Sequence, residues 1–63
     1  MEIRDVIDRA GGARRVAQEL QISRAAVYAW TRVPAEHVLR VAALAQVRPS
    51  DVDPALYPPG LVA

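Results

Sequence analysis

The sequence predicts an all-α fold, a small domain of four helices plus a short C-terminal turn. Apolar residues recur at the i, i+3, i+4, i+7 spacing of amphipathic helices in successive segments, and no segment alternates in the manner of a strand. Glycines and prolines separate these segments. With 63 residues and no cysteine, the chain should form one domain without disulfides or thiolate metal ligands.

The first two predicted helices meet at a glycine pair, Gly11-Gly12. The first begins near Ile3 and carries acidic residues in its first turn, where the helix dipole favours them. The second runs from about residue 12 to residue 20. The expected buried positions are Ile3, Val6, Ile7 and Ala10 in the first helix, and Ala13, Val16, Ala17 and Leu20 in the second.

A third helix should run from about Arg24 to Trp30 or Thr31. Ser23 has the side chain of an N-cap, and Ile22 and Val27 stand at hydrophobic-staple spacing. Two short helices joined by about three residues are typical of a helix-turn-helix, here spanning about residues 13–31.

The fourth helix should begin with Pro34 at its first position and end near Gln46. Its predicted buried stripe is Val38, Val41, Ala42 and Ala45, widened by Leu39 and Leu44. Beyond it, four prolines and Gly60 in residues 49–60 prevent another long helix, although residues 50–53 could form one capped turn. We therefore divide the chain into a helix-turn-helix DNA-binding domain at 1–48 and a Pro-rich tail at 49–63, packed on the domain or on a partner subunit.

Positive charge is concentrated in the middle of the chain. The net charge is only +1, but residues 13–34 hold four arginines against one glutamate. Arginine is the cation suited to phosphates and to guanine edges. A solvated helical face is the alternative explanation of the same charges.

Helical geometry separates a core side of the third helix from a reading side. Val27 and Trp30 point inward, so the outward face carries Arg24, Ala25, Tyr28 and Ala29. The guanidinium of Arg24 could donate two hydrogen bonds to a guanine. The alanines could touch a thymine methyl, and Tyr28 could bind a phosphate or a sugar. Two alternatives stay open: a phosphate contact alone for Arg24, and a surface position for Tyr28 with its hydroxyl in water.

Three further arginines are candidates for the DNA backbone. Arg14 and Arg15 lie at the start of the second helix, where free amides attract anions, and Arg32 follows the third helix. Each could instead be a solvated arginine. His37 has no partner ligand nearby, and no carboxylate pair or nucleophile stands in a catalytic spacing, so we expect no enzyme activity, no metal and no cofactor.

The sequence also argues against a membrane segment. Its uninterrupted apolar runs, such as 41–45, are far short of the roughly 20 residues that a span requires. The charged N-terminus lacks a signal-peptide core, so we expect a cytoplasmic protein.

Several motifs resemble the Cro-type regulators of lambdoid prophages, especially their YdaS-like branch. The similar pieces span about residues 11–58: Gly11-Gly12, Val16-Ala17, the run 23–30, Val33-Pro34-Ala35-Glu36 and Asp53-Pro54-Ala55-Leu56-Tyr57-Pro58. The resemblance implies a λ-repressor-like domain that represses transcription by binding operator DNA, often as a homodimer. It carries DNA contact onto Ser23, Arg24, Ala25, Tyr28 and Ala29, with Arg14 near the backbone. Some relatives are antitoxins, which implies a toxin protein as a further partner.

Two positions depart from the family pattern. Gln21 stands where the motif turn usually has glycine, and the left-handed conformation needed there costs another residue on the order of 1 kcal/mol. The link from Trp30 to Pro34 is also shorter and lacks a glycine.

The function predicted is a double-stranded DNA-binding repressor that occupies a promoter operator, with a protein-interaction module such as an antitoxin as the alternative. For the dimer surface we expect the apolar tail residues Leu56, Tyr57, Leu61 and Val62, which have no evident core stripe to join.

Overall fold

The computed structural model describes residues 1–60, and they are entirely helical apart from turns and connections, as the sequence predicts. The elements are α1 (Ile3–Arg9), α2 (Ala13–Leu20), α3 (Arg24–Tyr28), the 3-10 turn η1 (Ala35–His37), α4 (Val38–Ala45) and α5 (Pro49–Val52). Leu61 and Val62, two of the residues assigned to a dimer surface, lie outside the described part of the chain.

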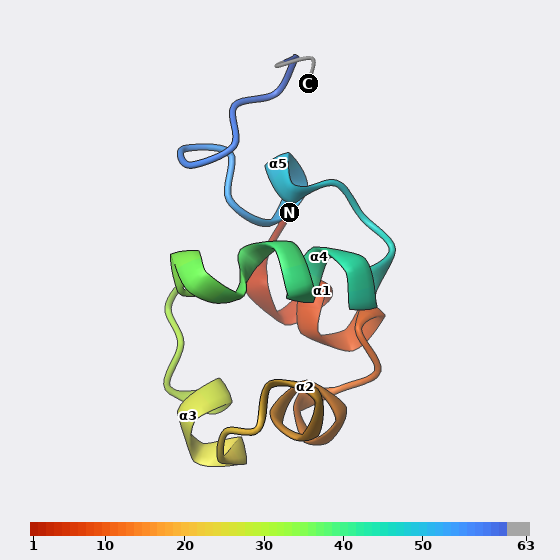
Figure 1. Cartoon of the computed structure of the whole chain (residues 1–63), viewed down its shortest axis with the longest axis vertical. Helices are drawn as coiled ribbons and strands as arrows, with labels where there is room; N and C mark the ends of the chain where they lie inside the picture. Colours follow the sequence, from red (N-terminus) through yellow and green to blue (C-terminus); the bar gives the residue numbers. More distant parts are fainter. Residues whose placement is uncertain (61–63) are drawn as a thin grey trace.

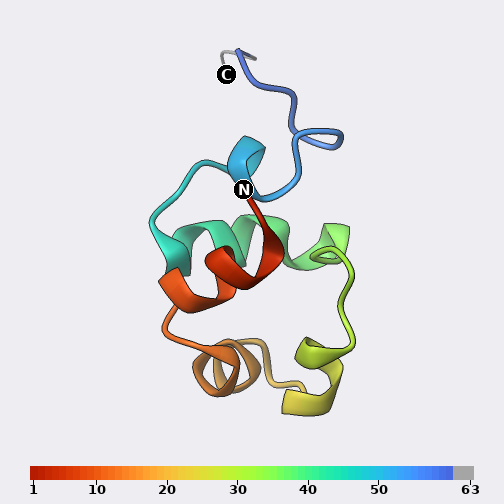
Figure 2. The same cartoon turned by 180° about the vertical axis from the view of Figure 1, so that it is seen from behind.

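The helices stack in three levels along the longest axis of the molecule (Figures 1 and 2). α1 and α4 lie against each other in the middle, α2 and α3 form one end, and α5 packs on the opposite side of α4. Residues 58–60 extend away from the helices beyond α5. The helix-turn-helix therefore occupies an end of the molecule that residues 49–60 leave uncovered.

The core is built from valine and alanine. Six valines and four alanines are buried: Val6, Val16, Val27, Val33, Val38, Val41, Ala10, Ala17, Ala42 and Ala45. Larger apolar side chains, including Ile3, Ile7, Leu20 and Trp30, are only partly buried around them. Small side chains let short helices approach closely, but each supplies little apolar area.

The prediction that Leu39 widens the buried stripe of α4 is wrong. Its side chain is 58% exposed, whereas Leu44 packs against the core as expected. At about 100° per residue, Leu39 is turned well away from both Val38 and Val41, so it points away from the buried stripe.

Three helices end in the same hydrogen-bonded motif. After α1 the amide of Gly12 donates to the carbonyl of Ile7 at 2.9 Å and that of Gly11 to Asp8 at 3.1 Å. Equivalent pairs of bonds close α2 at Gln21 and α4 at Gln46. This is the Schellman arrangement, which needs a left-handed residue after the helix. Gln21 has φ 57° and ψ 45°, which confirms the left-handed turn expected at that position.

Gln21→Gly should stabilise the protein by roughly 0.5–1 kcal/mol, because glycine adopts the left-handed region without the steric cost of a Cβ. Gln46→Gly should act in the same direction, since Gln46 has φ 57° as well. The measurement is chemical denaturation followed by circular dichroism. Gln18→Gly, at an exposed position inside α2, is the matched control and should destabilise by about 1 kcal/mol. Equal losses in Gln21→Gly and Gln18→Gly would contradict the argument.

The third and fourth helices begin and end differently from the prediction. α3 stops at Tyr28, two or three residues early, because Val33 must turn back into the core and Pro34 disfavours helical backbone before it. Pro34 is not the first helical residue. It has extended backbone with ψ 142°, and its carbonyl accepts from the amide of His37 at 2.8 Å to open η1.

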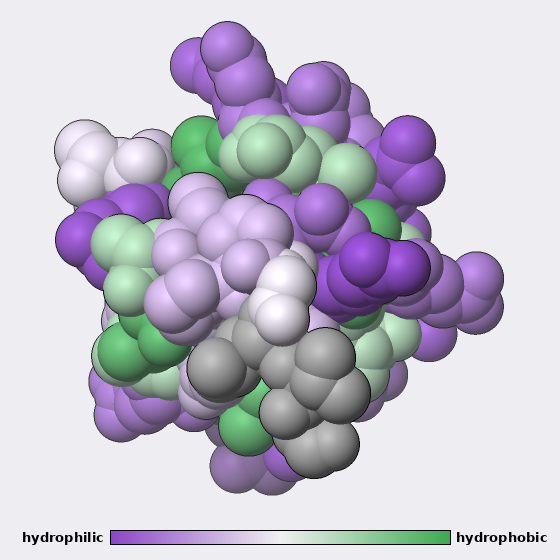
Figure 3. Space-filling model, turned by 90° about the horizontal axis from the view of Figure 1, so that it is seen from above, coloured by the Kyte–Doolittle hydropathy of each residue, from purple (hydrophilic) through white to green (hydrophobic). Residues whose placement is uncertain are grey.

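The C-terminal segment joins the same core. The carboxylate of Asp51 accepts from the amide of Arg48 at 3.1 Å at the start of α5. Val52 and Tyr57 pack against the buried cluster, so the expectation that Tyr57 lacks a core to join is wrong. Leu56 is 44% exposed. Seen from this end, strongly hydrophilic side chains lie mostly around the edge of the face and weakly polar or apolar ones over its centre (Figure 3).

Candidate nucleic-acid interface

α3 presents one side to the core and the other to solvent. Val27 is 1% exposed and anchors the helix, while the predicted reading residues are all exposed: Ser23, Arg24, Ala25, Tyr28 and Ala29. Tyr28 is the most open of the large apolar side chains, at 75% exposure. The core thus uses one side of a five-residue helix and leaves the other without a partner in the described chain.

The start of α3 is set by Ser23. Its hydroxyl accepts from the amide of Ala26 at 3.1 Å, which confirms the predicted N-cap. A cap of this kind contributes about 1 kcal/mol, a large amount for a helix of one and a half turns. Ser23 is consequently already engaged through one lone pair of its oxygen, which leaves the hydroxyl hydrogen and the second lone pair for a further group.

α2 supports α3 from behind. Val16 and Ala17 are buried between the two helices and the rest of the core, and the small side chain of Ala17 permits the close approach expected of a helix-turn-helix. Ala13 and Tyr28 line one surface cavity, which brings the start of α2 beside the end of α3. Arg14 is exposed next to this junction.

Arg15 is held along the joint between α1 and α2. A Cβ on Gly11 would come within 2.5 Å of Arg15 Cδ, so the aliphatic part of Arg15 lies over that glycine. Gly11 also has φ 107°, a conformation that other residues rarely adopt. The arginine stem is packed, and Arg15 is exposed overall.

Arg32, for which a phosphate contact is predicted, forms an ion pair within its own chain. Its Nη2 lies 2.5 Å from Oδ2 of Asp53, whose side chain is only 6% exposed. Asp53 also accepts from the amide of Leu56 at 3.1 Å, and its carbonyl accepts from Tyr57 at 2.9 Å. The ion pair ties the connection after α3 to the C-terminal turn, because the nearly buried carboxylate of Asp53 binds both Arg32 and the amide of Leu56. The Arg32 side chain is nevertheless 67% exposed, so its contact with the DNA backbone stays a prediction.

Sequence reasoning missed Asp53. Its run, Asp53-Pro54-Ala55-Leu56-Tyr57-Pro58, served only as a marker of family resemblance. An aspartate directly before proline, followed by a backbone turn, is a recognised capping signal. The partner Arg32 is 21 positions away, and no local pattern indicates that pairing.

Trp30 packs against the core, as predicted from its spacing to Val27. Its ring also stacks on His37, with centroids 6.0 Å apart and planes at 29°. The Nε2 atom of His37 lies 3.8 Å from a carboxylate oxygen of Glu36. His37 is thus a half-buried structural residue that joins the connection after α3 to the start of α4.

Acid should weaken the fold through Asp53. The hydrogen bond from Arg32, and then the one from the Leu56 amide, hold the pKa of this carboxyl below its ordinary value of 3.8. Its stabilising contribution is therefore present above pH 3.8 and is lost as pH falls through the lowered pKa. Thermal melts between pH 6 and pH 2 should show Tm falling on the acid side, and Asp53→Asn should reduce that slope. Asp8→Asn, at an exposed carboxyl, is the control and should keep the wild-type slope. Parallel curves for Asp53→Asn and the wild type would refute this role.

The predicted interface therefore separates into two parts. The exposed side of α3 and the two arginines of α2 lie on adjacent helices at one end of the molecule, whereas Arg32 is bound to Asp53. Within residues 1–60 the ion pairs are Arg32–Asp53 and His37–Glu36, so Arg14, Arg15 and Arg24 have no carboxylate partner there. These three guanidinium groups outnumber the single carboxylate of α2 and α3, that of Glu19, so this end carries a net positive charge.

A family model described as "Bacterial toxin YdaS" matches residues 3–59, which include every helix of the structure. The chain belongs to this family. The match confirms the YdaS-like part of the resemblance and extends it to α1. No curated protein and no solved structure matches the chain. None of the helices in the described part of this YdaS-family protein has the length and apolar character to cross a membrane.

Proposed function

We propose that this YdaS-family protein binds double-stranded DNA with α3 in the major groove and represses transcription by occupying an operator, as a Cro-type regulator does. The observation that carries the proposal is the exposed side of α3. Arg24, Ala25, Tyr28 and Ala29 are all open to solvent on a helix fixed from behind by Val27. Arg24 at the first helical position is where a helix-turn-helix reads base edges.

The arginines of α2 support the same proposal. Arg14 and Arg15 are exposed and without carboxylate partners in the described residues, so they are available to bind phosphates on either side of the groove. Such contacts orient the protein, and specificity comes from base edges. The function requires no metal, cofactor or catalytic group, and it would operate in the bacterial cytoplasm, where the DNA lies.

We further propose that the protein acts as a homodimer on DNA. Two copies would place their α3 helices in successive major grooves, about 34–36 Å apart. Of the tail residues first considered for the dimer surface, Leu56 is exposed and remains a candidate, whereas Tyr57 is used by the core of its own chain.

Selection from a randomised duplex library at physiological salt tests the proposal. We expect an enriched inverted repeat whose half-sites lie near one helical turn apart. Affinity should also fall steeply with salt, because several phosphates are neutralised. A single enriched half-site would contradict the dimer but not the DNA-binding function. Absence of any enriched sequence would refute specific DNA binding and favour a protein-interaction module such as an antitoxin.

The description of the family favours a second candidate, a toxin that arrests growth. The two functions are compatible if the toxicity arises from DNA binding. Controlled expression in a bacterial host would separate them: growth arrest that disappears in Arg24→Ala links toxicity to α3. Arrest of equal strength in wild type and Arg24→Ala would assign the toxicity to another surface.

A further inference from the structure

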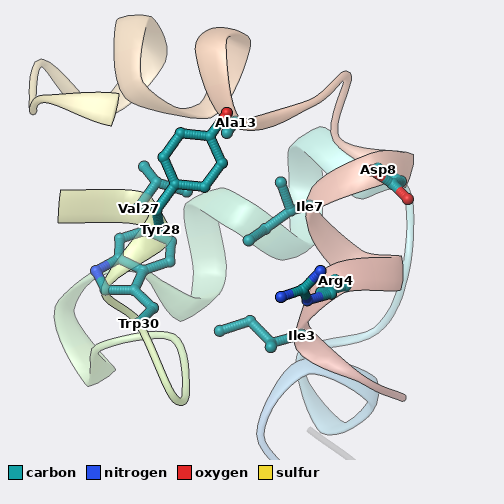
Figure 4. Close-up of a pocket in the computed structure, with 8 residues that line it drawn as sticks. All are labelled: Ile3, Arg4, Ile7, Asp8, Ala13, Val27, Tyr28 and Trp30. Carbon is teal, nitrogen blue, oxygen red and sulfur yellow. The ribbon is translucent and has the colours of Figure 1, made fainter. Parts of the chain in front are cut away.

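A surface cavity of about 340 Å³ lies between α1 and the end of α3. Figure 4 shows Ile3 and Ile7 of α1 on one side and the rings of Tyr28 and Trp30 on the other, with Val27 beside Tyr28. We name this cavity the aromatic slot. These four large side chains form an apolar part of its lining, Arg4 and Asp8 contribute charged groups, and no part of residues 1–60 fills the space between them.

The slot is suited to a protein rather than to a small molecule. One of its walls is Tyr28, which is 75% exposed, so the slot is open along that side. Small-molecule sites enclose most of their ligand's surface, which an open wall does not allow. In contrast, Tyr, Trp and Arg are the residue types that dominate the binding energy of protein interfaces, and Tyr28, Trp30 and Arg4 all line this one slot.

The charged residues at the rim of the slot indicate the charge of the group that a bound partner would place beside an apolar side chain. Arg4 has no carboxylate partner within residues 1–60, and Figure 4 shows its guanidinium extending toward the side of Trp30. The carboxylate of Asp8 lies further along α1 and points away from the aromatic rings. The cation is therefore beside the apolar space, and a carboxylate next to the inserted side chain would pair with it.

We propose that the aromatic slot docks a segment of a partner protein that presents one large apolar side chain flanked by an aspartate or glutamate. The apolar side chain inserts between Ile7 and the ring of Trp30, and the carboxylate binds Arg4. Neither the family match nor the DNA-binding proposal assigns a role to Ile3, Arg4 or Ile7.

One consequence rests on the proposed function. Tyr28 belongs both to the slot and to the exposed side of α3, so a partner seated in the slot covers part of the DNA-binding face. Partner and operator should then compete for the protein. The slot would be the point at which another protein relieves repression.

The test uses a displayed library of short random peptides selected on the full chain without DNA. Enriched peptides should share a large apolar residue with Asp or Glu close to it. Binding of a synthetic tryptophan-free representative can be followed directly, because Trp30 is the only tryptophan in the sequence and lies in the slot. Tyr28→Ala and Arg4→Glu, both at exposed positions, should each weaken binding at least about tenfold.

Arg9→Glu makes the same charge change on the same helix outside the slot and should leave peptide affinity unchanged. Enriched peptides without the apolar–acidic pattern, or equal losses in Arg4→Glu and Arg9→Glu, would overturn the proposal. Competition is measured separately with selected operator DNA. Peptide binding without any specific operator would refute the proposed function and leave the docking slot standing, whereas simultaneous binding of peptide and operator would refute the shared use of Tyr28.

Discussion

Arg24→Ala should weaken operator binding by roughly 1–3 kcal/mol, about 5- to 150-fold in affinity, and relax the preference at one base pair of each half-site. The reason is the position of Arg24 at the first residue of α3, exposed and without a carboxylate partner in the described chain. Its planar fork fits O6 and N7 of guanine, and alanine removes both donors. Titration of labelled duplexes, the operator and single-base variants of it, provides the measurement.

Arg24→Lys distinguishes base reading from a phosphate contact, the alternative that the sequence left open. Lysine keeps the charge but lacks the fork, so a phosphate contact would survive the change and guanine recognition would not. We expect Arg24→Lys to lose the base preference nearly as fully as Arg24→Ala. Arg40→Ala, at an exposed arginine on α4, controls for the loss of one positive charge. A loss of affinity that is uniform across all duplexes would show that Arg24 binds only phosphate.

Val41→Ala should destabilise the protein by about 2 kcal/mol, because two buried methyl groups are removed and the neighbouring helices close the cavity only partly. Val41 is 0% exposed and lies on the stripe of α4 that packs against α1. A domain of this length has a total stability of roughly 3–9 kcal/mol. One valine therefore carries a substantial share, and the variant should show a clearly lower denaturation midpoint by circular dichroism.

Leu39→Ala is the matched control for this prediction. It removes more carbon atoms than Val41→Ala, from the same helix, but the side chain is 58% exposed. We expect a change within about 0.5 kcal/mol, as for most surface substitutions. Similar losses in the two variants would mean that Leu39 is covered in solution, for example by a second copy of the chain.

The two stability predictions rest on the unusual composition of the core. Valine and alanine fill every fully buried apolar position in residues 1–60, and the large apolar side chains lie at the margins. Short helices joined by tight left-handed turns can pack closely around small side chains. Because that core is thin, bonds at its edge such as Arg32–Asp53 gain importance for stability.

Local sequence patterns, meaning the spacing of apolar residues and the capping residues, were sufficient to predict the helices. The left-handed backbone of Gln21 was expected from the family resemblance. Apolar spacing located all four main helices, and the hydroxyl of Ser23 located the start of α3. Each of these features depends on residues within about five positions of one another, and such short-range effects can be deduced from order alone. The exposed side of α3 followed in the same way, since Val27 defines which side is inward.

Only the tertiary structure decided what depends on distant segments. The ion pair that engages Arg32 joins positions 21 apart, and Tyr57 packs on a core made by other helices. The aromatic slot likewise combines Ile3 and Ile7 with Tyr28 and Trp30. Sequence order states which side of each helix is apolar, but the meeting of two such sides is determined by the packing of the whole chain.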